Sequence, residues 1–348
     1  MKNKKKRSSG GKTAMVILCV CLGLILTVLL GVTIYAQRLL NRINYINPGD
    51  QETMSPEEVS EYLATEETDP VGTEPTMNEA DVDWGDEGND SEIGKEDHII
   101  NILLIGQDAR PGEKRTRSDV MILCTINKDT KTLVMTSFLR DLYVRIPGYN
   151  SNKMNAAYAW GGMELLDATM EKNFGVHVDG NVEVNFEQFS DIIDTLGGVE
   201  IELRRDEAQL INSVVKGSKL TAGVQRLNGD QALFYSRIRA LDRDADFSRT
   251  NRQRKVLDSL IQEFKNADMA TILDLLEQVM PMITTDMTPE EIISYATEVF
   301  PMLSSATIVS QSIPVKGKYK DARIDGRAVL VADMNANREF LQKTLQGE

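Results

Sequence analysis

The chain has 348 residues, with 39 Lys and Arg against 53 Asp and Glu, and a formal net charge of −14. Binding of nucleic acid depends on broad neutralisation of phosphates, so this balance argues against a nucleic-acid partner. Three cysteines and two histidines, none in a metal-binding spacing, argue against a disulfide framework, a zinc site and a Ser–His or Cys–His catalytic set.

The N-terminal part of the chain predicts a membrane anchor. Residues 1–12 are a basic tail without acids, and residues 13–36 are uncharged and mostly apolar. A helix of that length spans ~36 Å, enough to cross a bilayer, so we expect a transmembrane helix over 13–37. The positive-inside rule places the tail in the cytoplasm and the rest of the chain outside a cell membrane that it crosses once. A cleaved signal peptide is the alternative, but its apolar core should span only ~7–15 residues.

An acidic extracellular linker should follow the anchor over 38–97. Residues 50–97 carry 18 acids against Lys95 alone, and the segment 47–97 is rich in Glu, Asp, Thr, Pro and Gly. A segment with so few apolar residues cannot bury enough surface to offset the entropy lost on ordering. The sequence therefore predicts a disordered stalk between the membrane and the folded part of the chain.

The rest of the chain has the pattern of an α/β domain. Near-continuous apolar runs are typical of strands buried on both faces, whereas apolar residues three and four apart indicate helices. Within 98–268 we expect strands at 99–105, 120–126, 132–138, 182–186 and 199–203, and helices at 153–160, 163–173 and 187–196, with a break at Gly161-Gly162. Within the C-terminal extension of the same domain, 269–348, we expect helices at 271–280, from Thr288 and at 334–345, and strands at 306–313 and 328–331. Strands that alternate with helices indicate a mixed central β-sheet flanked by helices.

Two aspartates are candidates for a metal site. Asp108 lies just past the end of the first expected strand, and Asp119 lies at the start of the second. Antiparallel pairing of these strands would bring both carboxylates to one edge of the sheet, where ligands of α/β proteins bind. Mg²⁺ takes oxygen ligands and commonly shares its shell with a phosphate, so it is the expected cation. Alternatively, both aspartates only cap loops as Asx-turns.

A dense cluster of cations lies between residues 237 and 255. Arginine binds phosphate bidentately and stays charged when buried, so such a cluster in an acidic chain indicates an anionic partner. The seven cations are Arg237, Arg239, Arg243, Arg249, Arg252, Arg254 and Lys255.

The helix expected after Asp246 should turn some of these cations inward. Its apolar stripe, formed by Val256, Leu260 and Phe264, extends toward the N-terminus onto Arg249, Arg252 and Gln253. A buried unpaired guanidinium is costly, and a helix N-terminus favours a phosphate, so we expect an anion there. The alternative is a structural ion pair with a nearby acid: Asp242, Asp244 or Asp246.

The other arginines have different expected surroundings. Arg243 and Arg254 should face solvent. Arg140 follows the third strand and can reach the same sheet edge as the aspartates, although a structural pair with Asp141 is its alternative. Arg237 and Arg239 alternate with Ile238, so an extended segment would project both to one side.

Several short motifs occur in order between residues 98 and 265. They include Asn-Ile-Leu-Leu-Ile-Gly-Gln-Asp-Ala-Arg, Arg-Ser-Asp-Val-Met, Leu-Arg-Asp-Leu-Tyr-Val-Arg-Ile-Pro-Gly, Lys-Met-Asn-Ala-Ala-Tyr-Ala-Trp-Gly-Gly and Asp-Phe-Ser-Arg-Thr-Asn-Arg-Gln-Arg. Together they resemble the LytR-CpsA-Psr family of Gram-positive cell-envelope proteins. The family usually has Pro before the Arg-Asp pair, where this chain has Leu139.

The resemblance implies a phosphotransferase that moves a glycopolymer, such as teichoic acid or capsular polysaccharide, from a polyprenyl-pyrophosphate carrier to peptidoglycan. It implies Mg²⁺ held by Asp108 and Asp119, and catalytic roles for Asp119, Arg140 and Arg249. The pyrophosphate would be bound by Arg117, Arg140, Arg237, Arg239, Arg249, Arg252 and Gln253. The lipid tail would need an apolar groove, which helices around Phe189 and Phe264 could line. Two alternatives stay open, a hydrolase that uses water as acceptor and a non-catalytic protein that binds the lipid carrier or has a regulatory role.

Overall fold

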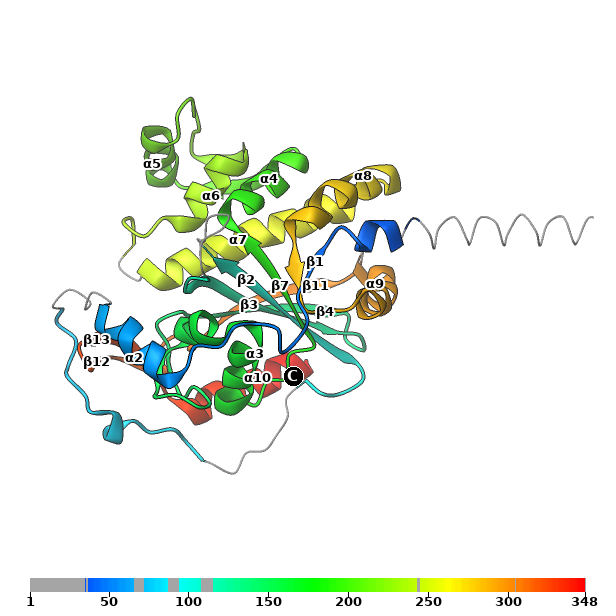
Figure 1. Cartoon of the computed structure of the whole chain (residues 1–348). Coiled ribbons are helices and arrows are strands. Elements are labelled where there is room, and N and C mark those ends of the chain that lie inside the picture. The colour runs from blue at the N-terminus through cyan, green and yellow to red at the C-terminus, as the bar shows by residue number, and fades with distance from the viewer. Residues whose placement is uncertain are drawn as a thin grey trace, which may run out of the picture.

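The computed structural model describes residues 35, 37–65, 72–86, 94–107, 115–242, 245–303 and 305–347. At its centre is a seven-stranded sheet with the strand order β1–β10–β7–β2–β3–β4–β11 (Figure 1). The strands are β1 (Asn44–Tyr45), β2 (Ile99–Gln107), β3 (Ser118–Asn127), β4 (Thr132–Phe138), β7 (Gly180–Asn185), β10 (Thr284–Thr285) and β11 (Thr307–Ile313). Strands β2, β3 and β4 pair antiparallel, whereas β7 and β11 pair parallel to β2 and β4, which confirms the predicted mixed sheet.

The three central strands are apolar on both sides because helices cover both faces of the sheet. Successive side chains point to opposite faces, so Leu123 of β3 belongs to one core and its neighbour Ile122 to another. On one face lie α3 (Met154–Phe174) and α10 (Met334–Gln346), and on the other lies α7 (Ala245–Asn266) (Figure 1). The fold is therefore a helix–sheet–helix sandwich.

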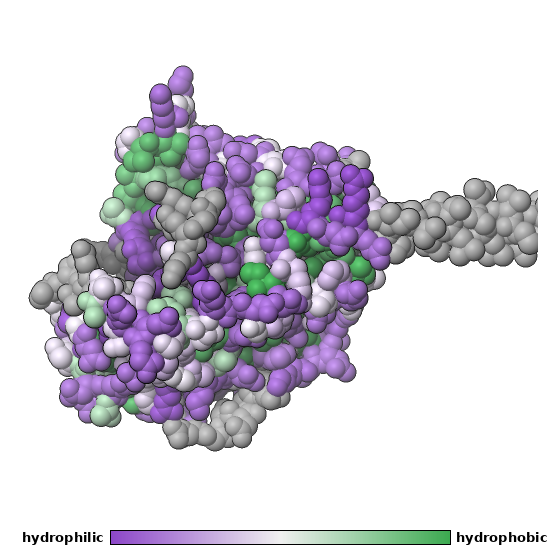
Figure 2. Space-filling model, viewed as in Figure 1, coloured by the Kyte–Doolittle hydropathy of each residue, from purple (hydrophilic) through white to green (hydrophobic). Residues whose placement is uncertain are grey.

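A second cluster of elements lies beside α7. It consists of α4 (Phe186–Thr195), β8 (Val199–Leu203), α5 (Arg205–Val214), β9 (Gly223–Leu227) and α6 (Gly229–Arg237). Ile201, Tyr235 and Val256 of α7 are buried together in its core, so α7 is shared between this core and the central sheet. Over α5 the surface is apolar (Figure 2), and Val214 there is 58% exposed.

The remaining elements are short or peripheral: α2 (Pro56–Thr65), η1 (Glu79–Asp81), β5 (Tyr143–Val144), β6 (Asn152–Lys153), α8 (Met269–Val279), η2 (Met280–Met282), α9 (Pro289–Leu303), β12 (Tyr319–Ile324) and β13 (Arg327–Ala332). The expected strands and helices are all present, and α3 is interrupted at Gly162, which has a φ of 70°. The sequence did not predict α5, β9, α6 or β12.

The prediction of a disordered stalk is wrong for the part of it that the structure describes. Strand β1 pairs in parallel with β10, and Val59 of α2 is buried in the main core. Met54 N donates to Trp160 O (2.8 Å), and Met163 N donates to Gln51 Oε1 (2.8 Å). The few apolar residues of this acidic segment suffice because they add to an existing core and do not have to build one.

The predicted transmembrane helix over 13–37 lies almost entirely outside the described residues. Among the residues that the structure describes, no helix is both long and apolar enough to span a bilayer. The first described residues lie against α8, where Arg42 Nη1 donates to Glu277 O (2.8 Å). The chain therefore joins the domain on the α8 side.

The change Leu341→Ala should lower the free energy of unfolding by about 2–5 kcal/mol, because this α10 side chain is fully buried in the main core. Urea unfolding measures the change. Glu339→Ala, on the exposed side of the same helix, should leave the stability nearly unchanged. A Leu341→Ala variant as stable as the wild type would show that α10 is not part of the core.

Candidate active site

Several predicted site residues gather where β2, β4 and β7 end and β3 begins. Arg140, just past β4, donates from Nη1 to Oδ1 of Asp119 on β3 (2.6 Å). Arg117 Nη1 donates to Asn155 Oδ1 at the start of α3, at 3.5 Å. Asn155 N in turn donates to Arg140 O (3.3 Å). The structure thus brings Arg117, Asp119 and Arg140 together at one edge of the sheet.

Arg140 is paired with acids and still partly accessible. Its Nε lies 3.4 Å from Asp141 Oδ2, while Lys153 Nζ lies 2.9 Å from Asp141 Oδ1. Burial lowers the pKa of Arg140, but the carboxylates of Asp141 and Asp119 outweigh burial and raise the pKa above its ordinary value. The structural Arg–Asp pair that the sequence offered as an alternative is present. Because the Arg140 side chain is 25% exposed, it can also contact a ligand.

The second expected metal ligand, Asp108, lies outside the described residues. Strand β2 is described up to Gln107, which pairs with Ser118, the neighbour of Asp119. Within the described ranges, no three His, Cys, Asp or Glu side chains form a group that could hold a metal ion. Asp119 therefore offers one carboxylate, and one of its oxygens is bonded to Arg140. With this one described carboxylate, Mg²⁺ would take its other ligands from water and phosphate, as that ion commonly does.

Arg249 is buried in the first turns of α7, with an exposed fraction of 3%. None of its three guanidinium nitrogens donates a hydrogen bond to an acceptor in the described part of the chain. Its Nη2 lies 3.1 Å from Asp246 Oδ1, an ion pair without hydrogen-bond geometry. Burial raises the pKa of Asp246, and the nearby Asp141 raises it further. Arg249 therefore keeps its full hydrogen-bonding capacity for an anion.

Arg252, three residues further along α7, is also buried, but each of its three guanidinium nitrogens donates a hydrogen bond. Nε donates to Glu207 Oε1 (2.9 Å), Nη1 donates to Ile238 O (3.0 Å) and Nη2 donates to Asp242. The structural ion pair that the sequence left open is therefore present at Arg252. With each nitrogen bonded inside the protein, Arg252 lacks the unmet hydrogen bonds that distinguish Arg249.

The prediction that Arg254 faces solvent is wrong, while Arg243 lies outside the described residues. Arg254 and Thr250, which precedes it by about one turn, are both buried. Burial lowers the pKa of Arg254 to about 10. Helix α7 is therefore enclosed on more of its circumference than its apolar stripe indicates.

Arg237 and Arg239 lie where α6 ends. The Arg237 guanidinium lies 4.6 Å from the centre of the Phe186 ring. Ile238 between the two arginines is extended and buried, whereas both arginines are exposed. Arg239 Nε lies 4.0 Å from Asp246 Oδ1, the oxygen that Arg249 also approaches. Arg239 and Arg249 thus converge on one carboxylate.

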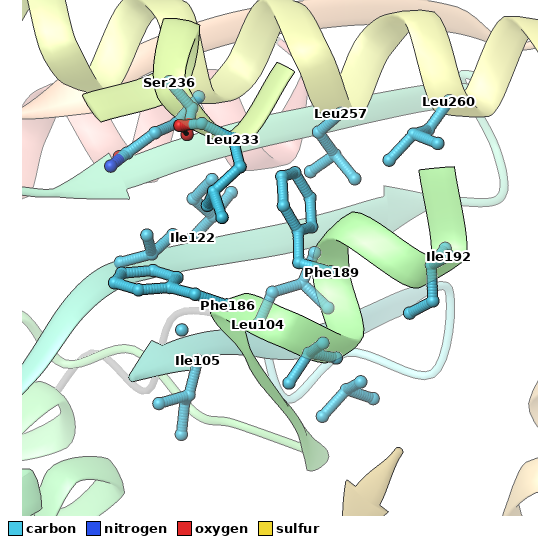
Figure 3. Close-up of a pocket in the computed structure, with 15 residues that line it drawn as sticks. Leu104, Ile105, Ile122, Phe186, Phe189, Ile192, Leu233, Ser236, Leu257 and Leu260 are labelled. Carbon is cyan, nitrogen blue, oxygen red and sulfur yellow. Dashed lines mark hydrogen bonds between the residues drawn. The ribbon is translucent and has the colours of Figure 1, made fainter. Parts of the chain in front are cut away.

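An apolar cavity of about 220 Å³ lies between the sheet and helices α4, α6 and α7 (Figure 3). Its walls are mostly aliphatic and aromatic, from Leu104, Val120, Ile122, Val182, Val184, Phe186, Phe189, Ile192, Leu233, Leu257 and Leu260. Two polar side chains, Ser236 and Gln253, also line it. Gln253 lies four residues after Arg249, on the same face of α7, and Phe186 contacts Arg237, so cations lie beside the cavity. Such a site suits an amphiphile with an apolar tail and an anionic head.

The sequence located this cavity only in part. Phe189 lines it, as expected, but Phe264 does not. The strand residues that form its floor, such as Ile122 and Val184, have the same apolar pattern as ordinary core residues. Phe186 carries no signal of its contact with Arg237, because the two residues lie on different helices and 51 positions apart in the sequence.

The described fold has counterparts in known proteins. Residues 61–346 match the LytR_cpsA_psr family. The chain is 34% identical over 257 residues to the regulatory protein MsrR of Staphylococcus aureus (strain COL), which covers 72% of this chain and 76% of MsrR. It is 34% identical over 194 residues to the polyisoprenyl-teichoic acid–peptidoglycan teichoic acid transferase TagU of Bacillus mycoides (strain KBAB4), which covers 55% of this chain and 62% of TagU.

Solved structures are similar over a comparable length. TagT bound to LIIa-WTA superposes with a TM-score of 0.59 at 30% identity, covering 72% of this chain and 90% of that one. TagT with bound octaprenyl pyrophosphate lipid superposes with a TM-score of 0.56 at 26% identity, covering 74% and 96%. Since the family match spans most of the sequence and includes the arginines and Asp119 described above, the chain belongs to the LytR-CpsA-Psr family.

Proposed function

We propose that this chain transfers a glycopolymer, such as teichoic acid or capsular polysaccharide, from a polyprenyl-pyrophosphate carrier to peptidoglycan. The observation that carries the proposal is Arg249, a buried guanidinium with no hydrogen-bond acceptor among the described residues, on the helix that lines the apolar cavity. A polyprenyl pyrophosphate supplies both the anion that such a guanidinium requires and an apolar chain suited to the cavity.

The names of the relatives support the same function. TagU is named as a transferase that moves teichoic acid from a polyisoprenyl carrier to peptidoglycan. The TagT structures carry an octaprenyl pyrophosphate lipid in one case and LIIa-WTA in the other. MsrR is named as a regulatory protein, so the experiments below include the non-catalytic alternative.

The proposed reaction is an attack by a hydroxyl of peptidoglycan on the sugar-linked phosphorus. The bond from this phosphorus to the bridging oxygen breaks, polyprenyl phosphate leaves, and a carboxylate at the sheet edge, Asp119 or a neighbour, takes the hydroxyl proton. Guanidinium groups stabilise the charge that develops on the leaving phosphate. The proposed phosphate ligands are Arg117 and Arg140 at the sheet edge, Arg237 and Arg239 after α6, and Arg249 and Gln253 on α7.

The proposed cofactor is Mg²⁺, held by Asp119 and Asp108 together with phosphate oxygens and water. Bound there, the ion would neutralise part of the pyrophosphate charge. The proposed location is the outer side of the cell membrane, with residues 13–37 as the anchor and residues 1–12 in the cytoplasm. In that orientation the domain reaches both a lipid-linked donor and peptidoglycan.

Arg249→Ala should lower turnover by on the order of 10³, as expected for loss of an arginine that stabilises the transition state of phosphoryl transfer. The assay uses the full chain in lipid nanodiscs with Mg²⁺, a polyprenyl-pyrophosphate-linked oligosaccharide and peptidoglycan fragments. It follows release of polyprenyl phosphate and attachment of the glycan. Arg205→Ala, which removes an exposed arginine on α5, is the matched control.

The same assay separates the alternatives. Attachment that requires peptidoglycan fragments supports the transferase, release without attachment indicates a hydrolase, and binding with neither indicates a regulatory protein. Full turnover in Arg249→Ala would contradict the assignment of Arg249.

Ile192→Trp should weaken binding of a long polyprenyl pyrophosphate by about tenfold, because the larger side chain fills the cavity from α4. Binding of inorganic pyrophosphate should not change, because that ligand has no tail. Asp191→Trp places the same ring on the exposed side of α4 and is the control. Equal effects on both ligands would contradict the assignment of the cavity to the lipid tail.

Removal of divalent metal should abolish transfer. The full chain treated with EDTA should lose turnover and regain it when Mg²⁺ is added in excess, because the ion neutralises part of the pyrophosphate charge. Asp119→Asn should raise the Mg²⁺ concentration needed for half-maximal turnover. Turnover that survives EDTA would rule out the proposed cofactor.

A further inference from the structure

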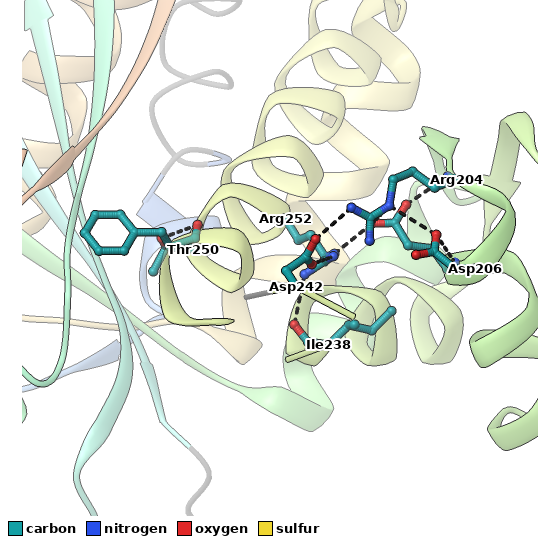
Figure 4. A network of polar contacts seen from close by, with 8 residues as sticks. Arg204, Asp206, Ile238, Asp242, Thr250 and Arg252 are labelled. Atoms are coloured by element: carbon teal, nitrogen blue, oxygen red, sulfur yellow. Dashed lines mark hydrogen bonds and ion pairs between the residues drawn. The ribbon is translucent and has the colours of Figure 1, made fainter. Parts of the chain in front are cut away.

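Arg252 connects three segments of the chain (Figure 4). From α7 it donates to Glu207 on α5 (2.9 Å), to the carbonyl of Ile238 at the end of α6 (3.0 Å), and to Asp242 in the connection between α6 and α7. Arg252 and Glu207 are both buried. Its guanidinium carbon also lies 5.9 Å from the centre of the Tyr235 ring, which is buried in the core beside α7.

Arg204 also binds both acids, Glu207 and Asp242. Arg204 Nη1 donates to Asp242 Oδ1 (2.7 Å), and Arg204 N donates to Glu207 Oε2 (2.9 Å). The hydrogen bond from Arg204, followed by the one from Arg252, lowers the pKa of Asp242. Both acids are therefore shared between two arginines, which fixes α5, the connection and α7 relative to one another.

The connection that this network holds carries two of the proposed phosphate ligands. Arg237 and Arg239 flank Ile238, whose carbonyl is one contact of Arg252, and Asp242 is another contact three residues after Arg239. These two contacts hold both ends of the short backbone segment that contains Arg239. The direction in which Arg239 projects follows from the path of this segment.

Arg249 precedes Arg252 by about one turn and has the opposite hydrogen-bonding state. Each nitrogen of Arg252 has an acceptor, whereas no nitrogen of Arg249 has one among the described residues. An incoming pyrophosphate can bond Arg249 without displacing a hydrogen bond. Arg252 already donates to two carboxylates and one carbonyl inside the protein, so it is committed to these buried contacts.

We infer that Arg252 is a positioning residue, which fixes the α6–α7 connection through Glu207, Asp242 and the Ile238 carbonyl so that Arg237 and Arg239 face the pyrophosphate. Arg252 itself does not contact the pyrophosphate. This inference rests on the proposed function. It separates the arginines that bind the pyrophosphate from Arg252, which positions two of them.

A double-mutant cycle on Arg252 and Asp242 tests the inference, with the full chain and inorganic pyrophosphate as the probe. Positioning predicts that Arg252→Lys and Asp242→Asn each weaken pyrophosphate binding by about tenfold, at a thermal midpoint still well above the assay temperature. The double variant should bind pyrophosphate no more weakly than the single variant that has the lower affinity, because both changes act through one contact. Losses that multiply, or unchanged binding in Asp242→Asn, would overturn the inference.

Two further variants provide a replacement for Asp242→Asn and a control. Where Asp242→Asn fails to fold, Glu207→Gln takes its place in the cycle, because it removes the charge of the other carboxylate that Arg252 contacts and so weakens that contact. Arg205→Ala, beside Arg204 and exposed, should bind pyrophosphate as the wild type does. A wild-type chain that binds pyrophosphate without transferring glycan would contradict the proposed function alone, and the binding cycle would still decide the role of Arg252. Intact transfer with multiplying losses would contradict only the positioning role.

Discussion

The buried guanidinium of Arg249, which has no hydrogen-bond acceptor among the described residues, is the constraint on which the rest of this site depends. Burial of such a charge without an anion is costly, and Asp246, whose carboxylate is also close to Arg239, meets Arg249 only as an ion pair without hydrogen-bond geometry. The elements around Arg249 are arranged to bind an anion. Arg117 and Arg140 come from the sheet edge, and the apolar cavity provides space for whatever the anion is attached to.

Helix α7 can bear this charge because it belongs to two cores at once. Val256 is buried with the elements around α5 and α6, while Leu257 packs on the central sheet. Burial on both sides fixes the helix, so its first turns need not contribute apolar contacts. The Arg252 network adds a third attachment, to α5 and to the α6–α7 connection, and leaves Arg249 open. Arg252, whose nitrogens all donate hydrogen bonds, thus lies about one turn from Arg249, whose nitrogens donate none to the described residues.

Much of the fold and of the candidate site could be predicted from the sequence, because helical periodicity and apolar runs are local signals. The stripe through Val256 and Leu260 correctly indicated that Arg249 and Arg252 point inward. The same stripe could not tell which arginine finds an acid, because Glu207 lies 45 positions from Arg252. The burial of Arg254 and the ordered contacts of Val59 also depend on segments distant in the sequence, and composition alone indicated solvent exposure and disorder for them.

An experimental structure of the full chain with bound polyprenyl pyrophosphate would test most directly whether Arg249 and the apolar cavity form one site. We expect phosphate oxygens at about 3 Å from the Arg249 guanidinium, with the first isoprene units in the cavity lined by Phe189 and Ile192. Arg252 should keep its contacts to Glu207 and Asp242 in that complex. A pyrophosphate bound away from Arg249, or a lipid chain outside the cavity, would contradict the claim that these two features form one site.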